Sequence, residues 1–506
     1  MSFGDFIDSV IEPFAPAAAA RRRAARIGLA AIRQYDAAKH DRRTYGWRRP
    51  ATSANAEIGG GLVGLRNGAR ELVRNNKYAA AARRQMVAQI VGDGITARAV
   101  HDDAAVARAA QDEWDEWSAS KVYQGTFDYY HVQKLIVGGT IEGGEMLQVW
   151  HAAENRPDAS VDVLEGDLLD NTKTQRLSDG RIVQGVEFDR DGNRRGYWLF
   201  DEHPGDVLFR SSLASNFVSA RNVDHIFEQT RSPQARGVSW FAPVMLTLRD
   251  VSEIEDARRL KEKVEACLAL VLTTSNENVG SPVLTGERQT QTDGRPDIET
   301  LRPGMVFRAR PGEEATTVNP TASADTVNFL RQQLAAVSAS LIPYHLMTGD
   351  VTGANYTALR AALLSFWSLL DDWQQQIFIP LACQSAFDRR MRVLATETGD
   401  ARYLKVKAQW AVPMRPLLDP VKDMNGEIIA IRAGLKTLTK ALTERGIDVD
   451  KHLTEIARIN GLIDDLKLAL DSDPRRLTDA GILQAAAGYL ATKGGAVSNA
   501  ASDTSN

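Results

Sequence analysis

Two spacings of apolar residues divide this chain into helical and strand-forming regions. Apolar residues at steps of three and four mark one face of a helix, whereas alternation marks a half-buried strand. The helical spacing dominates the region after the turn-rich stretch 51–61, and glycines at 92 and 94 end its second run as glycines commonly end helices. The pattern predicts helices at residues 62–73, 79–91, 104–119 and 123–138.

The pattern then becomes strand-like as far as residue 235. Short apolar runs predict strands at residues 145–151, 161–163, 182–188, 195–200, 207–209 and 225–228. Between two of them lies Asp189-Arg-Asp-Gly192, and Asp-Gly tolerates the positive backbone angles of a tight hairpin turn. Residues 60–235 are therefore predicted to form an α+β module around an antiparallel sheet.

The second half of the chain is mostly helical again. A long helix is predicted at 240–273, with one apolar stripe and densely paired charges elsewhere. An insert rich in Gly, Pro and Thr follows it, with short strands at 282–284 and 305–308. Further helices are predicted at 326–341, 356–395, 421–434, 437–446 and 449–470, and a polar loop at 343–355 separates the first two. The fold class is therefore α+β and predominantly helical.

Composition narrows the class of protein. With 506 residues, 43% hydrophobic and 25% charged, the chain suits a globular protein of two to four domains. Its net charge of -4 argues against a protein that wraps nucleic acid tightly. The two cysteines, Cys267 and Cys383, exclude a disulfide framework. No apolar run approaches the roughly 18 to 20 residues that span a bilayer, so we expect no membrane segment.

Catalytic and cofactor motifs are weak. Residues 59–64 satisfy G-x-G-x-x-G, but a polar stretch precedes them instead of the strand that a dinucleotide site needs. Residues 348–353 (TGDVTG) lack the Gly-Lys-Ser/Thr ending of a phosphate loop. The eight histidines form no His-Glu-x-x-His pair. We therefore predict no catalytic residue, no cofactor and no metal, and a protein that is not an enzyme.

Several short stretches, in this order, carry a family resemblance. They are RGVSWFAPV at 236–244, LRPG at 301–304, RPGE at 310–313, TGD at 348–350 and NYTALR at 355–360, with Asn75-Asn76 and LDP at 418–420 outside them. Together they resemble the lambda-type portal proteins of tailed bacteriophages, the head-tail connectors through which DNA is packaged.

The resemblance implies a portal-type fold. Its parts would be an N-terminal arm (1–60), an α+β wing (61–238), stem helices (239–274 and 325–342), a clip (275–324), a tunnel loop and tunnel helix (343–398), a helical crown (399–475) and a flexible tail (476–506). The implied function is a homo-oligomeric, dodecameric ring at one capsid vertex. It would pass double-stranded DNA and bind the terminase large subunit, the major capsid or scaffold protein and a head-completion protein, in the virion and, during assembly, in the host cytoplasm.

The resemblance also implies site residues. The tunnel loop and the start of its helix would bring to the DNA channel Thr348, Asp350, Thr352, Asn355, Tyr356 and Arg360. Thr348, Thr352 and Asn355 would face the lumen, and Asp350 would repel DNA and keep it from sticking. The clip residues for ring closure and motor docking would be Arg288, Arg295, Arg302, Arg308, Arg310 and Glu313.

Other interpretations remain open on the residues alone. The 348–355 stretch also suits an ordinary surface turn in which Asp350 and Thr352 cap the following helix. At the level of function, a monomeric interaction scaffold whose long helices pack within one chain is an alternative. A nucleic-acid-processing enzyme is a further one, although no cluster of carboxylates was found for it.

Overall fold

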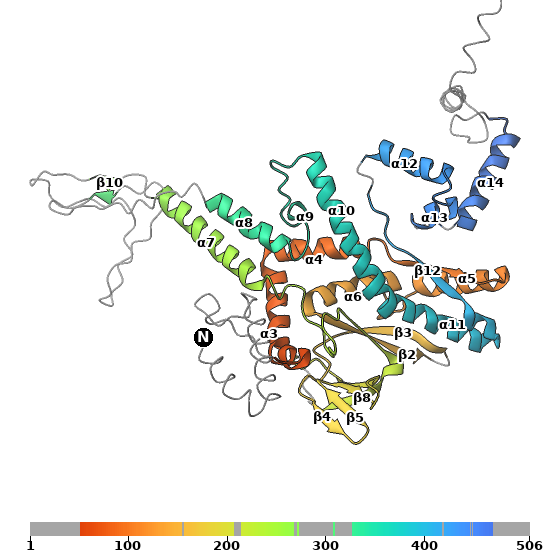
Figure 1. Cartoon of the computed structure of the whole chain (residues 1–506), viewed down its shortest axis with the longest axis horizontal. Coiled ribbons are helices and arrows are strands. Elements are labelled where there is room, and N and C mark those ends of the chain that lie inside the picture. Colours follow the sequence, from red (N-terminus) through yellow and green to blue (C-terminus); the bar gives the residue numbers. More distant parts are fainter. Residues whose placement is uncertain are drawn as a thin grey trace, which may run out of the picture. The chain divides into compact units, whose positions relative to one another are not determined.

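The computed structural model describes residues 51–153, 156–206, 214–267, 271–272, 307–308, 326–416, 419–445, 447 and 449–468 (Figure 1). The chain divides into two units, residues 1–57 and 58–506, and each is considered by itself. The described part of the first unit reaches from residue 51 into the first turn of a helix. All remaining elements belong to the second unit.

The first helix, α3 (Ala54–Asn75), begins earlier than predicted. The expected turn-rich entry at 51–61 is therefore wrong from Ala54 onward. The glycines of residues 59–64 lie inside this helix, whereas a dinucleotide fingerprint needs them at a strand-to-helix turn. The next helix, α4 (Lys77–Ile90), follows after a single residue, Asn76, whose side chain accepts hydrogen bonds from the N–H groups of Tyr78 and Ala79.

Two more helices precede the sheets. Helix α5 (Ala104–Ala119) has the predicted bounds. Helix α6 (Tyr129–Gly143) begins six residues later than predicted, because a tight turn closed by a bridge between Tyr123 and Phe127 occupies the expected start. Asp128 caps α6 by accepting from the N–H of His131 at 2.8 Å, which sets the true beginning of the helix.

The predicted antiparallel sheet is two sheets. A three-stranded one has the order β3-β2-β9, from β2 (Glu145–Ala153), β3 (Arg156–Glu165) and β9 (Val223–Phe227). A five-stranded one runs in chain order through β4 (Gln175–Leu177), β5 (Gly180–Val183), β6 (Val186–Phe188), β7 (Arg194–Phe200) and β8 (Ser215–Ser219). Helix α6 lies against β2 and β3 (Figure 1).

The hairpin predicted at residues 189–192 is confirmed, since it joins the antiparallel strands β6 and β7. The single strand predicted at 182–188 is wrong. Gln184 and Gly185 take positive φ angles of 48° and 85° and turn the chain back, so the run becomes the two strands β5 and β6. The strand predicted at 207–209 lies outside the described residues.

The long charged helix is confirmed over a shorter range. Helix α7 (Met245–Cys267) starts five residues later than predicted, and its partner α8 (Thr326–Ser338) lies beside it (Figure 1). Between them the structure describes only β10 (Val271–Leu272) and β11 (Phe307–Arg308), which pair in parallel. The predicted strand at 282–284 lies outside the described residues.

The helix predicted at 356–395 is continuous but not uniform. It consists of α10 (Tyr356–Trp373), a π-helical segment η3 (Gln374–Cys383) that contains Pro380, and α11 (Gln384–Thr398). Proline lacks an N–H group and cannot complete an ordinary helical hydrogen bond, which accounts for the change of winding there.

A strand that the apolar pattern did not predict follows. After the short 3-10 helix η4 (Ala401–Lys405), β12 (Lys407–Ala411) pairs antiparallel with β1 (Thr96–Val100), more than 300 residues earlier in the chain. The three predicted C-terminal helices are confirmed as α12 (Pro420–Arg432), α13 (Leu438–Thr443) and α14 (Val449–Asp465).

Aromatic residues join the early and late segments in one core. The ring of Trp114 on α5 lies 5.4–5.9 Å from the rings of Trp117, Tyr129, Phe387 and Trp410. Close contacts of this kind come from α5, α6, α11 and β12 together, so the core fixes the strand pair β1–β12 against the helices. The thiol of Cys383 is buried nearby, and burial raises its pKa to about 12.

Candidate functional site: the segment between α8 and α10

The segment predicted as a polar loop contains a short helix. Pro343 precedes α9 (Tyr344–Thr348), which buries Met347, and Gly349 ends the helix at a positive φ of 72°. The prediction of one polar loop over 343–355 is therefore wrong for its first half. Only residues 349–355 form the irregular connection to α10.

Asp350 is the centre of this connection. Its Oδ2 lies 3.0 Å from a guanidinium nitrogen of Arg331 on α8 and accepts from the hydroxyl of Tyr344 on α9 at 3.0 Å. Its Oδ1 accepts from the N–H of Thr352 at 2.9 Å. The carboxylate thus ties α8, α9 and the connection together.

These contacts fix the charge of the carboxylate. Hydrogen bonds from Thr352 lower the pKa of Asp350 to about 2, with further contributions from Tyr344 and Arg331. Burial together with the hydrogen bond to Asp350 raises the pKa of Tyr344. Burial lowers the pKa of His345, which favours the neutral form of this histidine. The local charge is therefore that of one ion pair.

Two of the other predicted tunnel-loop residues, Thr348 and Asn355, form hydrogen bonds with residues close to them in the chain. The hydroxyl of Thr348 donates to the carbonyl of Tyr344 at 2.8 Å and accepts from the N–H of Asp350 at 3.1 Å. Asn355, not Asp350 or Thr352, caps α10, since it accepts from the N–H of Ala358 at 2.8 Å. The capping roles considered for Asp350 and Thr352 are therefore wrong. Thr352 is exposed.

Tyr356 and Arg360 lie together at the start of α10. Arg360 donates to the Tyr356 hydroxyl at 3.1 Å, and its other terminal nitrogen lies 3.1 Å from Asp423 on α12. Tyr356 is 54% exposed. Of the predicted clip residues, Arg308 lies in β11, and the following lie outside the described residues: Arg288, Arg295, Arg302, Arg310 and Glu313.

Charged side chains are far fewer in residues 326–370 than in the neighbouring helix α7. From residue 326 to residue 370 the chain carries only Arg331, Asp350 and Arg360 as charged side chains besides His345, and each of the three is in an ion pair. Helix α7, by contrast, has 11 charged residues among its 23. Several of them pair along the helix, such as Arg249 with Glu253 at 3.0 Å.

A joint between α4 and α7 was missed by the sequence reasoning. The Asn76 amide donates to the carbonyl of Leu248 at 3.1 Å and to the hydroxyl of Ser252 at 2.8 Å. Beside it the Tyr78 hydroxyl donates to Glu255 at 2.7 Å, and burial with this bond raises the pKa of Tyr78. The Asn75-Asn76 pair was noticed in the sequence, but only as part of a family resemblance.

A buried ionic network holds the 236–244 stretch, which was also noticed only as a resemblance. The fully buried carboxylate of Glu145 forms hydrogen bonds with Arg66 at 2.7 Å and His225 at 3.0 Å, and it accepts one from the N–H of Gly237 at 2.9 Å. The guanidinium of Arg236 forms three further hydrogen bonds with it. Burial alone would raise the pKa of Glu145, but the charge of Arg236 and the bond from His225 hold it well below its usual range.

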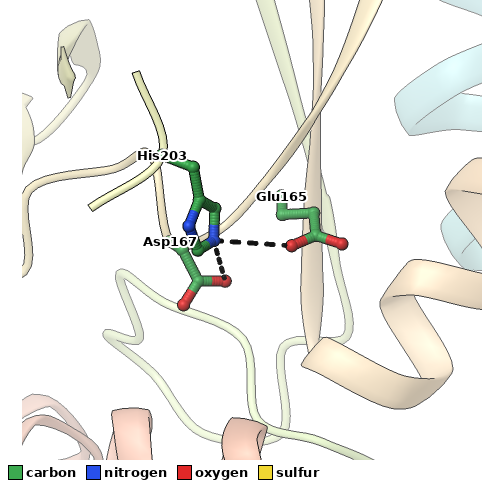
Figure 2. A group of neighbouring side chains, drawn as sticks. All are labelled: Glu165, Asp167 and His203. Atoms are coloured by element: carbon green, nitrogen blue, oxygen red, sulfur yellow. Dashed lines mark ion pairs between the residues drawn. The ribbon is translucent and has the colours of Figure 1, made fainter. Parts of the chain in front are cut away.

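One group of side chains has the residue types and the spacing of a metal site. Figure 2 shows Glu165, Asp167 and His203 turned toward one another, with His203 Nε2 at 3.8 and 3.9 Å from the two carboxylates. Arg70 already lies 2.5 Å from Glu165 and 2.6 Å from Asp167. The guanidinium of Arg70 thus already supplies a positive charge to both carboxylates, so we assign no metal to this group.

Comparison with known proteins decides the family. The sequence model described as "Phage portal protein, lambda family" matches residues 40–374, about two thirds of the chain. The chain belongs to the lambda family of phage portal proteins. The resemblance seen in the sequence is thereby confirmed, and with it the portal function. The family is structural, not catalytic.

Individual relatives agree with this assignment. The chain is 26% identical over 424 residues to a "probable portal protein" of Halomonas phage phiHAP-1, covering 78% of this chain and 79% of the relative. It is 22% identical over 477 residues to the "portal protein" of Escherichia phage N15, covering 82% and 87%. A scaffold or a nucleic-acid enzyme is therefore not favoured.

Solved structures show a weaker similarity. A chain in the virion of a native gene transfer agent particle has a TM-score of 0.35 and 15% identity, covering 80% of this chain and 97% of that one. A chain in the neck of a native particle, computed with C12 symmetry, has a TM-score of 0.37 and 14% identity, covering 80% and 96%. At these TM-scores the similarity supports no statement about this chain. Among the described helices none is long and apolar enough to cross a membrane.

Proposed function

We propose that this chain is the subunit of a ring at one vertex of a phage capsid, and that double-stranded DNA enters and leaves the head through the ring. Membership of the lambda family of portal proteins supports the ring and its place in the virion. Head-to-tail contacts between identical subunits close such a ring. Assembly would take place in the host cytoplasm.

The observation that carries the proposal is the charge-poor stretch 326–370. A wall along which DNA slides must not hold phosphates, because each unpaired Lys or Arg facing the DNA adds a salt-dependent attraction. In this stretch every Arg and Asp is in an ion pair, and the exposed side chains of α8 include Asn328 and Gln332, which are polar and uncharged. We infer that α8, the 349–355 connection and the start of α10 face the channel.

The remaining elements suit the other parts of a portal. Helices α7 and α8 would be the stem, and residues 275–324 the clip that binds the terminase large subunit and later a head-completion protein. The sheets and α3 to α6 would be the wing, which would contact the major capsid or scaffold protein. Helices α12 to α14 would be the crown. The joint between Asn76 and α7 would transmit displacement of the stem to the wing.

The ring is tested by electron microscopy of the purified full-length chain in negative stain. Class averages viewed down the symmetry axis should show rings, twelvefold in most particles, with a central hole wide enough for duplex DNA. Compact single particles, also in the presence of the capsid and scaffold proteins, would contradict the proposal and favour a monomeric scaffold. Cleavage of DNA by the purified chain with magnesium would favour an enzyme.

The channel-facing surface has a separate test. Thr352→Cys and Arg249→Cys variants, each labelled with an aryl azide, would be assembled into DNA-filled particles and irradiated. Both positions are exposed, one on the 349–355 connection and the other on α7. We expect DNA adducts from position 352 and none from position 249. Adducts from position 249 alone would place α7, and not the connection, against the DNA.

A further inference from the structure

The C-terminal helices α12, α13 and α14 bury few of their own side chains. Among the described residues of these helices, the buried ones are Ala441 and Thr443 on α13 and Val449 and Ile463 on α14. A helix in a protein gains most of its stability when its apolar side packs against another element. Two apolar sides of this group face water instead, one on α14 and one on α12.

The first of them, the α14 face, runs along the whole of that helix. Its residues recur at steps of three and four, which keeps them on one side of a helix. All are between 36% and 59% exposed, and they are Leu453, Ile456, Ile459, Leu462 and, directly after the helix, Leu466. Glu455 lies four positions before Ile459 and therefore on the same side, where it pairs with Arg458 at 2.6 Å. The α14 face is thus apolar with one carboxylate.

The second, the α12 face, has the same spacing. Val421, Met424 and Ile428 are exposed on one side of α12, and Leu435 follows seven positions after Ile428, beyond the end of the helix. Leu435 is 85% exposed and Val421 is 70% exposed. Arg432 lies four positions after Ile428 on the same side, is exposed and has no ion-pair partner among the described residues. The α12 face is thus apolar with one cation.

The two faces are attached to different parts of the fold. Helix α12 is held at its start, where Asp423 lies 3.1 Å from Arg360 on α10. Helix α14 is held at its start by Lys451, which lies 2.9 Å from Asp115 on α5. In Figure 1, α12 and α14 are the left and right members of the group. Both faces are exposed in the single chain, so neither covers the other there.

We propose that the α14 face of one subunit packs on the α12 face of the next copy of the same chain. The two faces are apolar, extend over similar lengths (453–466 and 421–435), and carry charges of opposite sign in Glu455 and Arg432. A contact between two different faces of identical subunits leaves one of each free, and repetition closes a ring. The proposal rests on the proposed ring and assigns one of its subunit contacts.

Disulfide formation in the assembled full-length protein tests the contact. Ile428→Cys and Ile459→Cys lie at the middle of the two faces, where packed helices touch whatever their crossing angle. Both are introduced with Cys267→Ser, whereas Cys383 is buried and stays. On mild oxidation the double variant should give a ladder of covalent multimers up to the whole ring. Each single variant should give none, and a mixture of the two single variants should give covalent dimers only.

Matched controls use an exposed apolar residue outside these helices, Leu404 on η4. Leu404→Cys combined with Ile459→Cys should give no ladder. Leu462→Asp places a charge in the apolar contact, so the fraction of subunits in rings should fall at least about tenfold. Leu404→Asp should leave that fraction unchanged. Negative-stain electron microscopy of the same samples counts the rings.

The outcomes separate this contact from the ring itself. Wild-type rings together with a double variant that forms rings but no ladder would overturn the contact and leave the ring standing. Disulfides within one chain, or covalent dimers from a single variant, would overturn it as well, since they indicate a contact within the subunit or a two-fold one. Absence of rings from every protein, the wild type included, would overturn both proposals.

Discussion

Arg331 and Asp350 are 19 residues apart, and their side chains form a 3.0 Å ion pair that joins α8 to the connection before α10. They are the only two charged residues between positions 326 and 355 apart from His345. Asp350 also accepts hydrogen bonds from the Tyr344 hydroxyl and the N–H of Thr352. The ion pair therefore leaves the stretch without net charge and holds its conformation. We therefore infer that Asp350 joins α8 to the connection as one half of a neutral ion pair, while the expected repulsion of DNA by Asp350 stays a prediction.

The first prediction concerns this pair and DNA. Asp350→Asn leaves Arg331 charged and without its carboxylate, so each subunit gains one cation that can hold a phosphate. We expect purified Asp350→Asn assemblies to bind a short DNA duplex more tightly than the wild type at about 50 mM salt, with a steeper loss of affinity toward 200 mM salt. Fluorescence anisotropy of labelled duplex across that salt range measures both.

The matched control removes both charges. Arg331→Gln combined with Asp350→Asn should bring the salt dependence back to that of the wild type, because the added cation is absent. A salt dependence that is unchanged in Asp350→Asn would show that Arg331 does not face the DNA. It would also count against the channel-facing assignment of the 349–355 connection.

A second prediction concerns the joint between α4 and α7. Asn76→Ala removes both the cap of α4 and the hydrogen bonds to Leu248 and Ser252. We expect a loss of about 1–3 kcal/mol of stability, from the lost cap and the unpaired carbonyl. Asn75→Ala is the control, since Asn75 is exposed and bonds only to Glu71 at 3.0 Å. Thermal unfolding compares the two, and equal shifts would contradict the joint.

A third prediction concerns the buried carboxylate of Glu145. Glu145→Gln keeps the shape but leaves Arg236 without its counter-charge in the interior, and it leaves Arg66 with only Asp167, 3.3 Å away. Removing one partner of a buried ion pair costs about 3–5 kcal/mol. The exposed Glu165→Gln, on the adjoining strand end, should cost no more than about 0.5 kcal/mol. Denaturant unfolding distinguishes them, and a Glu145→Gln protein as stable as the wild type would show that the network contributes no net stability.

The same network makes stability depend on pH. Burial lowers the pKa of His225 to about 4, with Glu145 acting in the opposite direction. In the unfolded chain an ordinary histidine titrates near 6.5. Between about pH 6.5 and 4 the unfolded state therefore binds the extra proton, and stability falls as the pH is lowered, by up to about 1.4 kcal/mol per pH unit.

His225→Gln should remove this slope between about pH 6.5 and 4, although the variant is less stable overall. Below about pH 4.5 the depressed pKa of Glu145 adds a second loss, which should persist in that variant. His203→Gln, at a 41% exposed side chain, is the control and should keep the wild-type slope. Melting temperatures measured from pH 7 to pH 4 give the three curves. Parallel curves for the wild type and His225→Gln would refute the assignment.

The elements that the sequence predicts correctly are those fixed by interactions between residues close together in the chain. Helix α5 was predicted to the residue, because its apolar stripe and its Asp103 cap are both local. The start of α6 was not, since the Tyr123–Phe127 turn interrupts a run that looks helical. Strand β12 could not be predicted, because five residues of mixed polarity become a strand only through pairing with β1.

The candidate site shows the same limit. The sequence identified residues 348–360 through a family resemblance, but the partner of Asp350 lies on another helix and no periodicity marks it. Arg331 could have been found by a different observation, namely that a long stretch of the chain contains a single cation and a single carboxylate. Similarly, Glu145 gave no signal, because the four groups that surround it are distant in sequence and meet only in the folded protein.

The last prediction concerns the edge of β1 that faces away from β12, where the Gln111 amide bonds to the backbone of Ala97 and Ala99. Gln111→Leu keeps the size of the side chain but removes the amide that serves Ala97 and Ala99. Two backbone groups at a partly buried edge then lose their partners, which should cost about 1–2 kcal/mol. Gln85→Leu on α4 is the control, with no such contact and an expected change within about 0.5 kcal/mol. In hydrogen exchange the Ala99 amide should become fast in Gln111→Leu, while the amides of Thr96 and Arg98, which face β12, stay slow. Loss of protection along the whole strand would mean instead that Gln111 holds β1 in place and does not merely close its edge.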